Sequence, residues 1–460
     1  MKKVLILGLG SYKNGSGIAA AKFFLKRGAI VRVTDLKNER ELVHQVRELK
    51  KIAKPGQLEF ILGKHRTSDI KWAELIVQNP GTPDDSPFLQ LARELKKEIT
   101  NDVAIFLERA ENPVLGVTGT RGKSTTTALL YEMIKKEFPR ARLGGNIGVS
   151  PLTFMDTIRP NDPVVLELSS WLLHHIKIGP EIAVVTNILE DHLNRYRSLD
   201  DYAADKANIL RGAGMAVLNF DNHRTQKLRV RSQESGVRKV VWFSAKERPP
   251  GECVYVKNGA IVARSHAPGS GFEEKIICKL SDIKLLGGHN MANVLAAAAA
   301  AWAFGIQLKK IGDAIKQFKG LSNRLELVKT AGGVKWYNDT TATSPDAVVA
   351  ALAALDHKKH IVLIAGGTDK QLDFHEMARA IKHSAKTSIL FTGTATQKLV
   401  SLLPEQDYHL VSSMKEAVVL AQKLAKRGEI VLLSPGAASF GIFKNEFDRG
   451  GQFVKLVRQL

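Results

Sequence analysis

The stretch VLGVTGTRGKSTTTALL, from Val114 to Leu130, contains the residue types that bind a nucleotide phosphate. A phosphate group is held by backbone N–H donors, by the positive end of a helix and by a cation. GTRGKST supplies all three if a helix begins at Ser124, so that Lys123 reaches the outer phosphates and the Ser124 hydroxyl binds magnesium. The usual phosphate-binding loop has glycine six residues before its lysine, where Val117 stands here. The stretch therefore predicts a nucleotide-binding loop with a variant spacing.

Acidic side chains follow two further apolar runs. Glu167 ends the run in PVVLELSS, and Glu190, Asp191 and His192 lie on the loop after the second run, in TNILEDHLNRY. The carboxyl ends of parallel strands converge on one ligand crevice, and oxygen ligands suit magnesium. Glu167 is thus predicted to be a metal ligand, whereas the three loop residues are either ligands or an ordinary surface loop. Lys206, in DYAADKANIL, lies on a predicted helix, where a solvated lysine is the common case.

Alternating apolar runs and amphipathic segments predict the framework that positions these residues. Runs such as KVLILGLG, VVLELSS and HIVLIAGG are separated by helical segments, which is typical of parallel α/β sheets. A chain of 460 residues also exceeds what a single hydrophobic core serves. We therefore predict an α/β fold of three domains. They are a Rossmann-like domain over residues 1–101, a central P-loop domain over 102–320 and a second Rossmann-like domain over 321–460.

Four local patterns refine this framework. Asn222–Val240 is rich in Arg and Lys and is predicted to be a solvated surface stretch before a β-rich insert near CVYVKNGAIVARS. Val294–Gly305 is apolar but too short to cross a bilayer, and predicts a buried helix. Near the N-terminus, GLGSYKNGSG resembles a dinucleotide-binding loop with Lys13 in place of the third glycine. Asp35 ends the next strand, where an acid either binds a ribose hydroxyl or closes an ordinary turn.

Composition limits the function classes. Lys and Arg exceed Asp and Glu by 21, which indicates either anionic partners or simply a basic surface. Cys253 and Cys278 are too few for a disulfide framework and lack CxxC spacing. MKKVLILGLG runs directly into glycines and is predicted to be a first strand rather than a signal peptide. We expect a cytoplasmic protein, monomeric and without stable membrane insertion.

Nine motifs, in their order along the chain, resemble those of the Mur ligases. They are GVTGTRGKST, GGNIGVSP, LELSSWLL, TNILEDHLNRY, YAADKANIL, GGHNMAN, NRLELV, YNDTTATSP and LLSPGAASFGIFKNEFDRGGQF. The resemblance covers essentially the whole chain and is strongest to the members that add glutamate to UDP-N-acetylmuramoyl-L-alanine. The family's loop pattern is G-x-x-G-T-x-G-K-[ST], in which Val117 occupies a free position.

The resemblance implies an ATP-dependent ligase. Members transfer the γ-phosphoryl group of ATP to a substrate carboxylate, and the amine of an amino acid attacks the resulting acyl phosphate to give an amide, ADP and phosphate. Two Mg²⁺ ions are implied, one on Ser124 and Glu167 and one between Glu167 and His192. The lysine that matches Lys206 is carbamylated in the family, which turns a cation into an anion that helps to hold the second ion. The residues implied at the reaction centre are thus Lys123, Glu167, His192 and Lys206.

The same resemblance implies three groups of binding residues. The nucleotide group is Gly119, Thr120, Arg121, Gly122, Lys123, Ser124, Thr125, Asn290 and Asn293, with His289 nearby and with Arg324 and Asp339 from the third domain. The nucleotide-sugar group is Gly10, Ser11, Asp35, Asn79 and Gly81, with Asn146 between the substrates. The glutamate group is Thr343, Lys370, Ser439 and Phe443, with Lys444 nearby.

Two positions depart from the family's pattern, which often has lysine where Thr341 stands and histidine where Asn323 stands. A charged hydrogen bond is worth about 1.5 to 3 kcal/mol, so glutamate binding needs a replacement such as Lys370. The enantiomer is left open, D-glutamate being the family's usual substrate.

Two other functions stay open at this stage. One is a different ligase of the superfamily, acting with another amino acid or on folate. The other is a nucleic-acid-associated ATPase, which the net charge of +21 would suit. Such a protein should carry a basic groove with stacking aromatics or a known module. Aromatic residues make up only 7% of the chain and no such module is present, so we expect no nucleic-acid partner.

Overall fold

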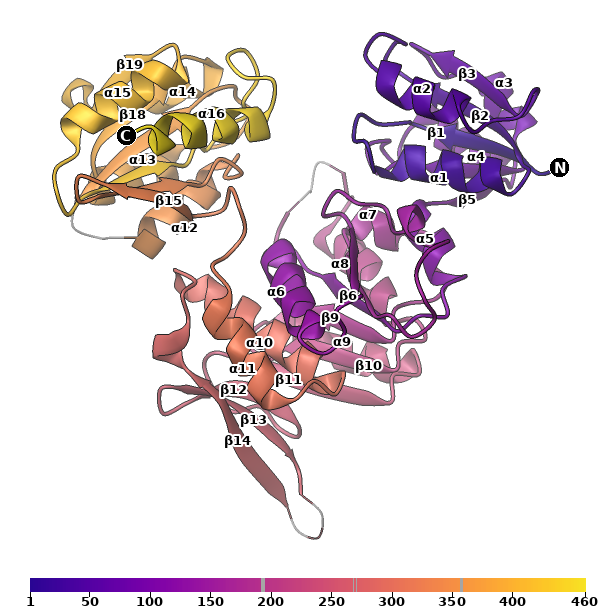
Figure 1. The fold of residues 1–460 in the computed structure, drawn as a ribbon, viewed down its shortest axis with the longest axis horizontal. Helices are drawn as coiled ribbons and strands as arrows, with labels where there is room; N and C mark the ends of the chain where they lie inside the picture. Colours follow the sequence, from indigo (N-terminus) through magenta and orange to yellow (C-terminus); the bar gives the residue numbers. More distant parts are fainter. Residues whose placement is uncertain (192–194, 268, 270, 356–358) are drawn as a thin grey trace. The chain divides into compact units, whose positions relative to one another are not determined.

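The computed structural model describes residues 1–191, 195–267, 269, 271–355 and 359–460 (Figure 1). The chain divides into two compact units. The first unit comprises Met1–Ile283 with Ala292–Lys316, and the second comprises Lys284–Met291 with Gln317–Leu460. Both consist of parallel-rich sheets with connecting helices, which confirms the predicted α/β fold class.

The N-terminal part of the first unit contains a five-stranded, wholly parallel sheet. Its order is β3 (Leu58–Leu62), β2 (Ile30–Asp35), β1 (Lys3–Leu7), β4 (Leu75–Gln78) and β5 (Glu98–Thr100). The associated helices are α1 (Ser16–Lys26), α2 (Val43–Lys50), α3 (Thr67–Trp72), α4 (Pro87–Glu94) and α5 (Asp102–Leu107). The strand order reverses between β1 and β4, and ligands of such sheets bind beyond the strand ends at this reversal.

A second, nine-stranded sheet completes the first unit. Its order is β14 (Phe272–Lys279), β13 (Ala260–His266), β12 (Cys253–Lys257), β11 (Lys239–Ser244), β10 (Met215–Asn219), β9 (Ile182–Val185), β6 (Val114–Thr118), β8 (Val164–Glu167) and β7 (Arg142–Gly145). Pairing is parallel from β7 to β12 and antiparallel from β12 to β14. The predicted β-rich insert is therefore an antiparallel extension of the sheet. Its first hairpin turns at Asn258 and Gly259, both with positive φ, as a tight hairpin turn requires.

The helices of this sheet are α6 (Lys123–Lys135), α7 (Ser170–Leu173), α8 (Leu199–Ala207), α9 (His223–Glu234), α10 (Gly288–Ala303) and α11 (Leu308–Gln317), with short 3₁₀ turns at Pro151–Thr153, Asn208–Leu210 and Leu280–Asp282. Helix α6 begins one residue before the predicted start. Helix α10 contains the predicted buried apolar segment, since Val294 to Ala301 are fully buried.

Most residues of the predicted surface stretch Asn222–Val240 are solvent-exposed, as expected, and the part His223–Glu234 forms α9. The helical spacing is difficult to recognise among its many charged residues. Thr225, Leu228 and Ser232 have this spacing and are buried on one face of the helix. The side chain of Asn222 caps the helix by accepting a hydrogen bond from the Thr225 amide at 3.1 Å. Three buried residues and a cap are enough to fix a helix whose other positions are solvated.

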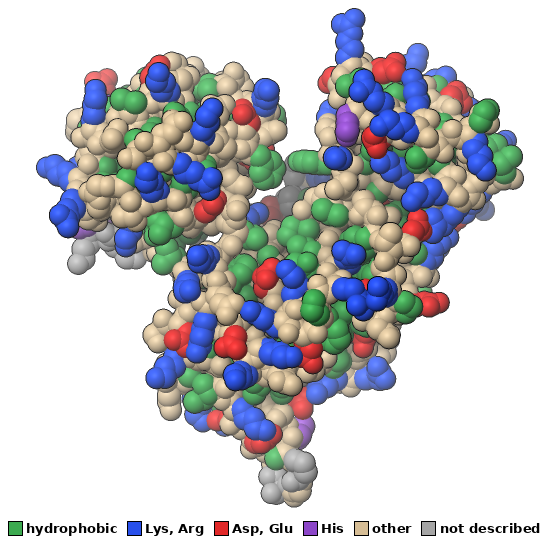
Figure 2. Space-filling view, viewed as in Figure 1, with side chains coloured by type: hydrophobic (Ala, Val, Ile, Leu, Met, Phe, Trp, Pro, Cys, Tyr) green, Lys and Arg blue, Asp and Glu red, His purple; other side chains and the backbone are tan. Residues whose placement is uncertain are grey.

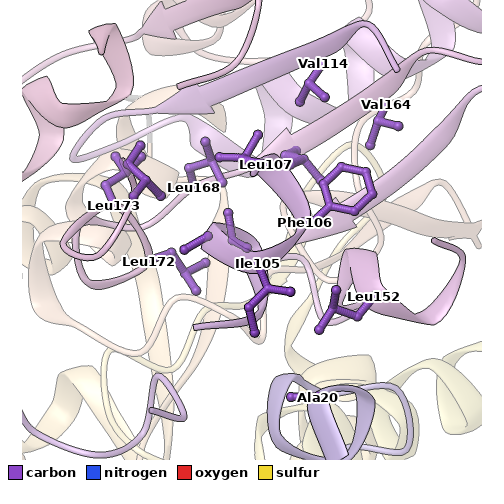
Figure 3. Close-up of a cluster of buried hydrophobic side chains, with 14 of the residues drawn as sticks. Ala20, Ile105, Phe106, Leu107, Val114, Leu152, Val164, Leu168, Leu172 and Leu173 are labelled. Atoms are coloured by element: carbon purple, nitrogen blue, oxygen red, sulfur yellow. The ribbon is translucent and has the colours of Figure 1, made fainter. Parts of the chain in front are cut away.

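The core of the first unit is continuous between its two sheets. Figure 3 shows Ala20 of α1 near Leu152, with Ile105 and Phe106 of α5 and leucines from the segment after β8 in the same cluster. Phe106 also packs edge-on against Phe154, with ring centroids 5.9 Å apart. Helices α5 and α1 thus form an apolar link between the two sheets.

The second unit contains a six-stranded sheet. Its order is β15 (Glu326–Ala331), β16 (Val334–Asn338), β20 (Ile430–Leu433), β17 (Ile361–Gly366), β18 (Ala385–Phe391) and β19 (Tyr408–Val411), antiparallel only between β15 and β16. Its helices are α12 (Pro345–Leu355), α13 (His375–Ser384), α14 (Thr394–Val400), α15 (Met414–Leu424) and α16 (Glu446–Arg458), with a 3₁₀ turn at Glu405–Asp407.

A fully buried arginine fixes α16 against the loops of this sheet. Arg449 donates hydrogen bonds to the Thr340 hydroxyl at 3.1 Å, to the Thr340 carbonyl at 2.9 Å and to the Ala437 carbonyl at 3.3 Å. Burial lowers the pKa of Arg449 to about 10, so the group still carries its charge at neutral pH. These bonds tie together the loops after β16 and β20.

Within the described residues, no helix is both long and apolar enough to span a bilayer. On the face drawn in Figure 2, Lys and Arg side chains are spread over the chain, with Asp and Glu among them.

Replacing Arg449 with methionine should destabilise the second unit. Two buried carbonyl oxygens would lose their donors, at a cost of about 1–3 kcal/mol each. We expect the free energy of unfolding to fall by roughly 2–6 kcal/mol. Urea unfolding, followed by the fluorescence of Trp336 in the second unit, measures the change. Arg458→Met is the matched control, because Arg458 is exposed on the same helix. Equal stability of the two variants would contradict the prediction.

Candidate functional site

The phosphate-binding loop lies between β6 and α6, and two of its glycines are required by their surroundings. Gly119 has φ of +149°, and a Cβ there would lie 1.9 Å from the Thr186 hydroxyl. Gly122 is left-handed, with φ of +83°, and a Cβ there would lie 2.0 Å from the Asn293 side-chain oxygen. Only glycine fits both positions without displacing neighbours. Ser124 and Thr125 follow in the first turn of α6, half-exposed at its N-terminus.

Residues after the neighbouring strand β9 hold this loop in shape. The Thr120 amide donates to the Asn187 carbonyl at 2.9 Å, and the Arg121 amide donates to the Asn187 side chain at 2.9 Å. Tyr202 of α8 lies 3.3 Å from the Thr120 hydroxyl. Asn187 and Tyr202 were not among the predicted site residues. The motif TNILEDH offered a signal for Asn187, because β9 pairs with β6 and its end therefore lies beside the loop.

Lys123 and Lys206 converge on one backbone oxygen. The Lys123 ammonium group donates to the Gly119 carbonyl at 2.8 Å and to the Thr120 carbonyl at 2.9 Å, and Lys206 Nζ also donates to the Gly119 carbonyl at 2.8 Å. Lys206 is buried, 1% exposed, so it is not the solvated lysine that its local sequence indicated. Burial, and then the nearby charge of Lys123, hold the pKa of Lys206 well below its usual range.

Glu167 ends β8 directly beside β6, with Val117 as its ladder partner. Its Oε1 accepts a hydrogen bond from the Asn146 side chain at 2.9 Å, and its buried Oε2 has no partner among the described residues. Asn146 is also tied to Glu167 by its amide, which donates to the Glu167 carbonyl at 2.8 Å. An unpaired buried carboxylate oxygen is costly unless a cation or donor meets it, so this oxygen fits a metal ligand.

The remaining predicted metal ligand, His192, lies outside the described residues. Asp191, on the same loop, lies 3.8 Å from Arg121 of the phosphate loop. Among the residues that the structure describes, no three His, Cys, Asp or Glu side chains are grouped as a metal would require. A metal at Glu167 would therefore need further ligands, such as a hydroxyl, a phosphate, a modified lysine or His192.

Two asparagines on α10 were predicted to lie near the nucleotide. Asn293 is buried against Gly122, and its carbonyl accepts a hydrogen bond from Thr126 at 3.5 Å. Asn290, one turn earlier and within the second unit, donates to the Leu286 carbonyl at 2.7 Å. His289 lies in the same helix, but its side chain is outside the description. Asn293 therefore contacts the phosphate loop directly.

The predicted nucleotide-sugar residues gather beyond the ends of β1, β2 and β4. A Cβ on Gly10 would lie 3.2 Å from the Asn79 amide nitrogen, and the Asn79 side chain accepts a hydrogen bond from the Gly81 amide at 2.9 Å. Asp35 accepts from the amides of Leu9 and Gly10 at 2.8 and 3.1 Å.

The other oxygen of Asp35 accepts from the Lys37 amide at 2.9 Å. Its carboxylate is therefore engaged by the chain's own backbone and shapes the first loop. Ser11, exposed in that loop, accepts a hydrogen bond from the Lys37 ammonium group. Its carbonyl accepts another from Gln45 at 2.7 Å.

In the second unit, Asp339 follows β16 and is buried. Its carboxylate accepts hydrogen bonds from the Leu325 amide at 3.1 Å and from the Ser434 hydroxyl at 2.8 Å. Burial raises the pKa of Asp339 to about 6. Arg324, next to Leu325, is exposed. Asp339 thereby fixes the backbone that presents Arg324.

The predicted glutamate residues come from three loops of this sheet. Lys370 donates to the Thr343 hydroxyl at 3.1 Å, which joins the loops after β17 and β16. The loop after β20 carries Ser439 and Phe443, and it pairs with the loop after β17 through a bridge between Thr368 and Ala438. β16, β20 and β17 are neighbours in the sheet, so their carboxyl ends bring these residues together.

The two positions that depart from the family's pattern contact each other. The Thr341 hydroxyl donates to the Asn323 carbonyl at 2.8 Å, and the Asn323 side chain accepts from Asn338 at 2.9 Å. Asn323 has a φ of +68°, a conformation that asparagine tolerates better than most residues. The neutral pair thus braces the segment before Arg324.

Three family models match the chain. They are the MurD-like N-terminal domain of Mur ligases over residues 2–101, the Mur ligase middle domain over 117–301 and the Mur ligase glutamate ligase domain over 323–436.

Curated relatives align along nearly their whole length. A protein of Roseiflexus sp. (strain RS-1), named UDP-N-acetylmuramoylalanine–D-glutamate ligase, is 40% identical and covers 99% of this chain and 98% of its own. A protein of Borreliella afzelii (strain PKo) with the same name is 37% identical, and the alignment covers 99% of this chain and 97% of that protein.

Among solved structures, the UDP-N-acetylmuramate–alanine ligase MurC of Thermotoga maritima covers all of both chains with a TM-score of 0.60 and 20% identity. At that identity the likeness concerns the fold. The family models and the full-length relatives go further: this chain belongs to the Mur ligase family.

Proposed function

We propose that this chain is the ATP-dependent ligase that joins D-glutamate to UDP-N-acetylmuramoyl-L-alanine in peptidoglycan precursor synthesis. The observation that carries the proposal is the loop of Gly119 to Ser124, with Lys206 and Glu167 beside it, in a chain 40% identical to a D-glutamate ligase over almost its whole length. The family models support the same assignment, since they include the MurD-like N-terminal domain and the glutamate ligase domain.

The reaction proceeds in two steps on this proposal. The substrate carboxylate attacks the γ-phosphorus of ATP, which forms an acyl phosphate and releases ADP. The amine of glutamate then attacks the acyl carbon, an amide forms, phosphate leaves and the amine loses a proton. In phosphoryl transfer, the protein mainly positions the reacting groups and stabilises their charge. When ATP binds, Lys123 would exchange its hydrogen bonds to the Gly119 and Thr120 carbonyls for contacts with the outer phosphates. The loop amides would donate to the same phosphates.

Magnesium fits the residues around Glu167. One ion would be held by the unpaired buried oxygen of Glu167 and by the hydroxyl of Ser124. A second ion would be held by Glu167, His192 and a carbamylated Lys206. When bound, the ions would reduce the repulsion between two anions, the γ-phosphate and the substrate carboxylate. Asn146 orients Glu167 for this role.

Carbamylation of Lys206 is supported by its environment. The neutral amine nitrogen attacks the carbon of CO₂ and loses one proton, which gives an anionic carbamate. Only the neutral amine is a nucleophile, and burial together with Lys123 favours that form. A neighbouring cation also stabilises the anion that results.

The substrates divide among the three domains on this proposal. Residues 1–101 would hold the nucleotide-sugar through Gly10, Ser11, Asp35, Asn79 and Gly81. Residues 102–320 would hold ATP. Residues 321–460 would hold glutamate through Thr343, Lys370, Ser439 and Phe443.

Substrate choice can be tested directly. Purified protein with ATP, magnesium and UDP-N-acetylmuramoyl-L-alanine should release phosphate with D-glutamate, and much less with L-glutamate, alanine or lysine. Mass spectrometry of the product should show the added glutamyl residue. Turnover with another amino acid or with a folate, but none with glutamate, would overturn the proposal.

Removal of the loop cation should disable the reaction. Lys123→Ala should reduce kcat at least about a hundredfold, because a preorganised charge on the transferring group is lost. Lys136→Ala, exposed just beyond the other end of α6, is the matched control and should retain wild-type kcat. Comparable loss in both variants would show that the helix, rather than the charge, is what matters.

Loss of the carbamate should be repairable from solution. Lys206→Ala should be inactive, and formate or acetate should restore part of the activity by supplying a carboxylate in the vacated space. Lys123→Ala should show no such rescue. In ¹³C NMR with labelled bicarbonate, wild type should show a carbamate carbon that Lys206→Ala lacks. Full activity of Lys206→Ala would refute the carbamate.

A further inference from the structure

Two adjacent histidines, His174 and His175, follow α7 and have no part in the reaction described above. Their rings stand edge to face, with centroids 4.9 Å apart. His175 Nε2 lies 2.6 Å from the side-chain oxygen of Gln78, the last residue of β4. His174 Nδ1 lies 3.0 Å from the carboxylate of Asp205 on α8. The pair thus connects the two sheets of the first unit.

The contact of His175 has a defined polarity. The Gln78 amide nitrogen donates to the Thr82 carbonyl at 2.9 Å and to the Asp84 carboxylate at 3.1 Å, so its oxygen faces His175. That oxygen can only accept, and His175 Nε2 must therefore carry the proton. Gln78 is buried, 5% exposed, so its oxygen would be left unpaired without this donor.

His175 makes this contact as a neutral imidazole. Burial, and then the neighbouring His174, lower the pKa of His175 to about 4, against the opposing effects of Asp84 and Asp205 and with Arg93 also lowering it. The hydrogen bond therefore stays unchanged across the neutral pH range. Its role is structural positioning rather than proton transfer.

The turn that Gln78 controls carries two of the proposed nucleotide-sugar residues. Asn79 and Gly81 follow Gln78 directly, and the Thr82 amide donates to the Asn79 carbonyl at 2.8 Å. Gln78 closes this turn from the other side through the Thr82 carbonyl. A reoriented Gln78 would release Thr82 and Asp84, and the turn would lose part of its defined shape.

The protein segment that carries the histidines is itself firmly held. The Leu172 carbonyl accepts a hydrogen bond from Asn101 at 2.9 Å, and the Leu173 carbonyl accepts one from Asn208 at 3.2 Å. Both asparagines are buried. His175 therefore extends from a fixed support in the central sheet region to a turn of the N-terminal sheet.

We propose that His175 is a positioning residue for the nucleotide-sugar, which holds the turn from Gln78 to Asp84 in its binding shape by donating a hydrogen bond to Gln78. The inference rests on the proposed function, because it assigns the nucleotide-sugar to this turn. It predicts a selective effect: affinity for the nucleotide-sugar depends on His175, whereas ATP and glutamate binding do not.

Steady-state kinetics with each substrate varied in turn test this selectivity. His175→Leu should raise KM for UDP-N-acetylmuramoyl-L-alanine about tenfold, the equivalent of about 1.4 kcal/mol, and leave kcat and the other two KM values within about twofold. Gln78→Leu should raise this KM at least as much, because it also removes the hydrogen bonds to Thr82 and Asp84. The double variant should be no worse than Gln78→Leu alone, because the contact with His175 is already lost there. His175→Gln can still donate to Gln78 and should recover most of the affinity.

His409→Leu is the control, since His409 is exposed on β19 and far in sequence from this turn. It should match wild type in every constant. An unchanged KM for the nucleotide-sugar in His175→Leu would overturn the role of His175, as would an equal rise in all three KM values, which indicates general damage. A wild-type protein that does not turn over this nucleotide-sugar would instead refute the proposed function and, with it, this inference.

Discussion

The carbonyl oxygen of Gly119 accepts hydrogen bonds from both Lys123 and Lys206, and this shared acceptor determines where the charge of the site lies. Two amino groups held so close repel each other when both are protonated, and burial adds to that cost. The arrangement favours the neutral form of Lys206. On the proposed function, Lys123 would exchange its two backbone carbonyls for a phosphate. An anionic ligand would therefore reduce the repulsion between these two amino groups.

Backbone geometry makes this convergence possible. Gly119 and Gly122 stand where any side chain would collide with Thr186 or Asn293, so the loop can approach both β9 and α10. Parallel pairing of β8, β6 and β9 then places the ends of three strands at one edge. Strand order places Glu167 at this edge, and its buried Oε2 has no hydrogen-bond partner among the described residues.

The phosphate loop could be predicted from sequence because its signals are local: a strand, glycines, Lys123 and a helix within a few residues. Interactions between distant segments could not be predicted in that way. The Asn187 side chain, which follows a neighbouring strand, accepts a hydrogen bond from the phosphate loop, and the Asp35 carboxylate accepts one from the first loop of the chain. A local sequence pattern predicts neither contact. The burial of Lys206 follows from tertiary packing. Its neighbours in the sequence therefore indicated a solvated lysine, and only the resemblance to the Mur ligases indicated a role for it.

In the second unit, neutral residues stand at the two positions that depart from the family's pattern beside the proposed glutamate site. The Thr341 hydroxyl donates to the Asn323 carbonyl and the Asn323 side chain accepts from Asn338, so these contacts brace the segment before Arg324 without adding charge. Lys370 then remains as a cation among the proposed glutamate residues. Burial lowers the pKa of Lys370 from its usual value, and the nearby charge of Glu446 opposes this effect. On the proposed function, a substrate carboxylate would act in the same direction as Glu446 and stabilise the ammonium form of Lys370.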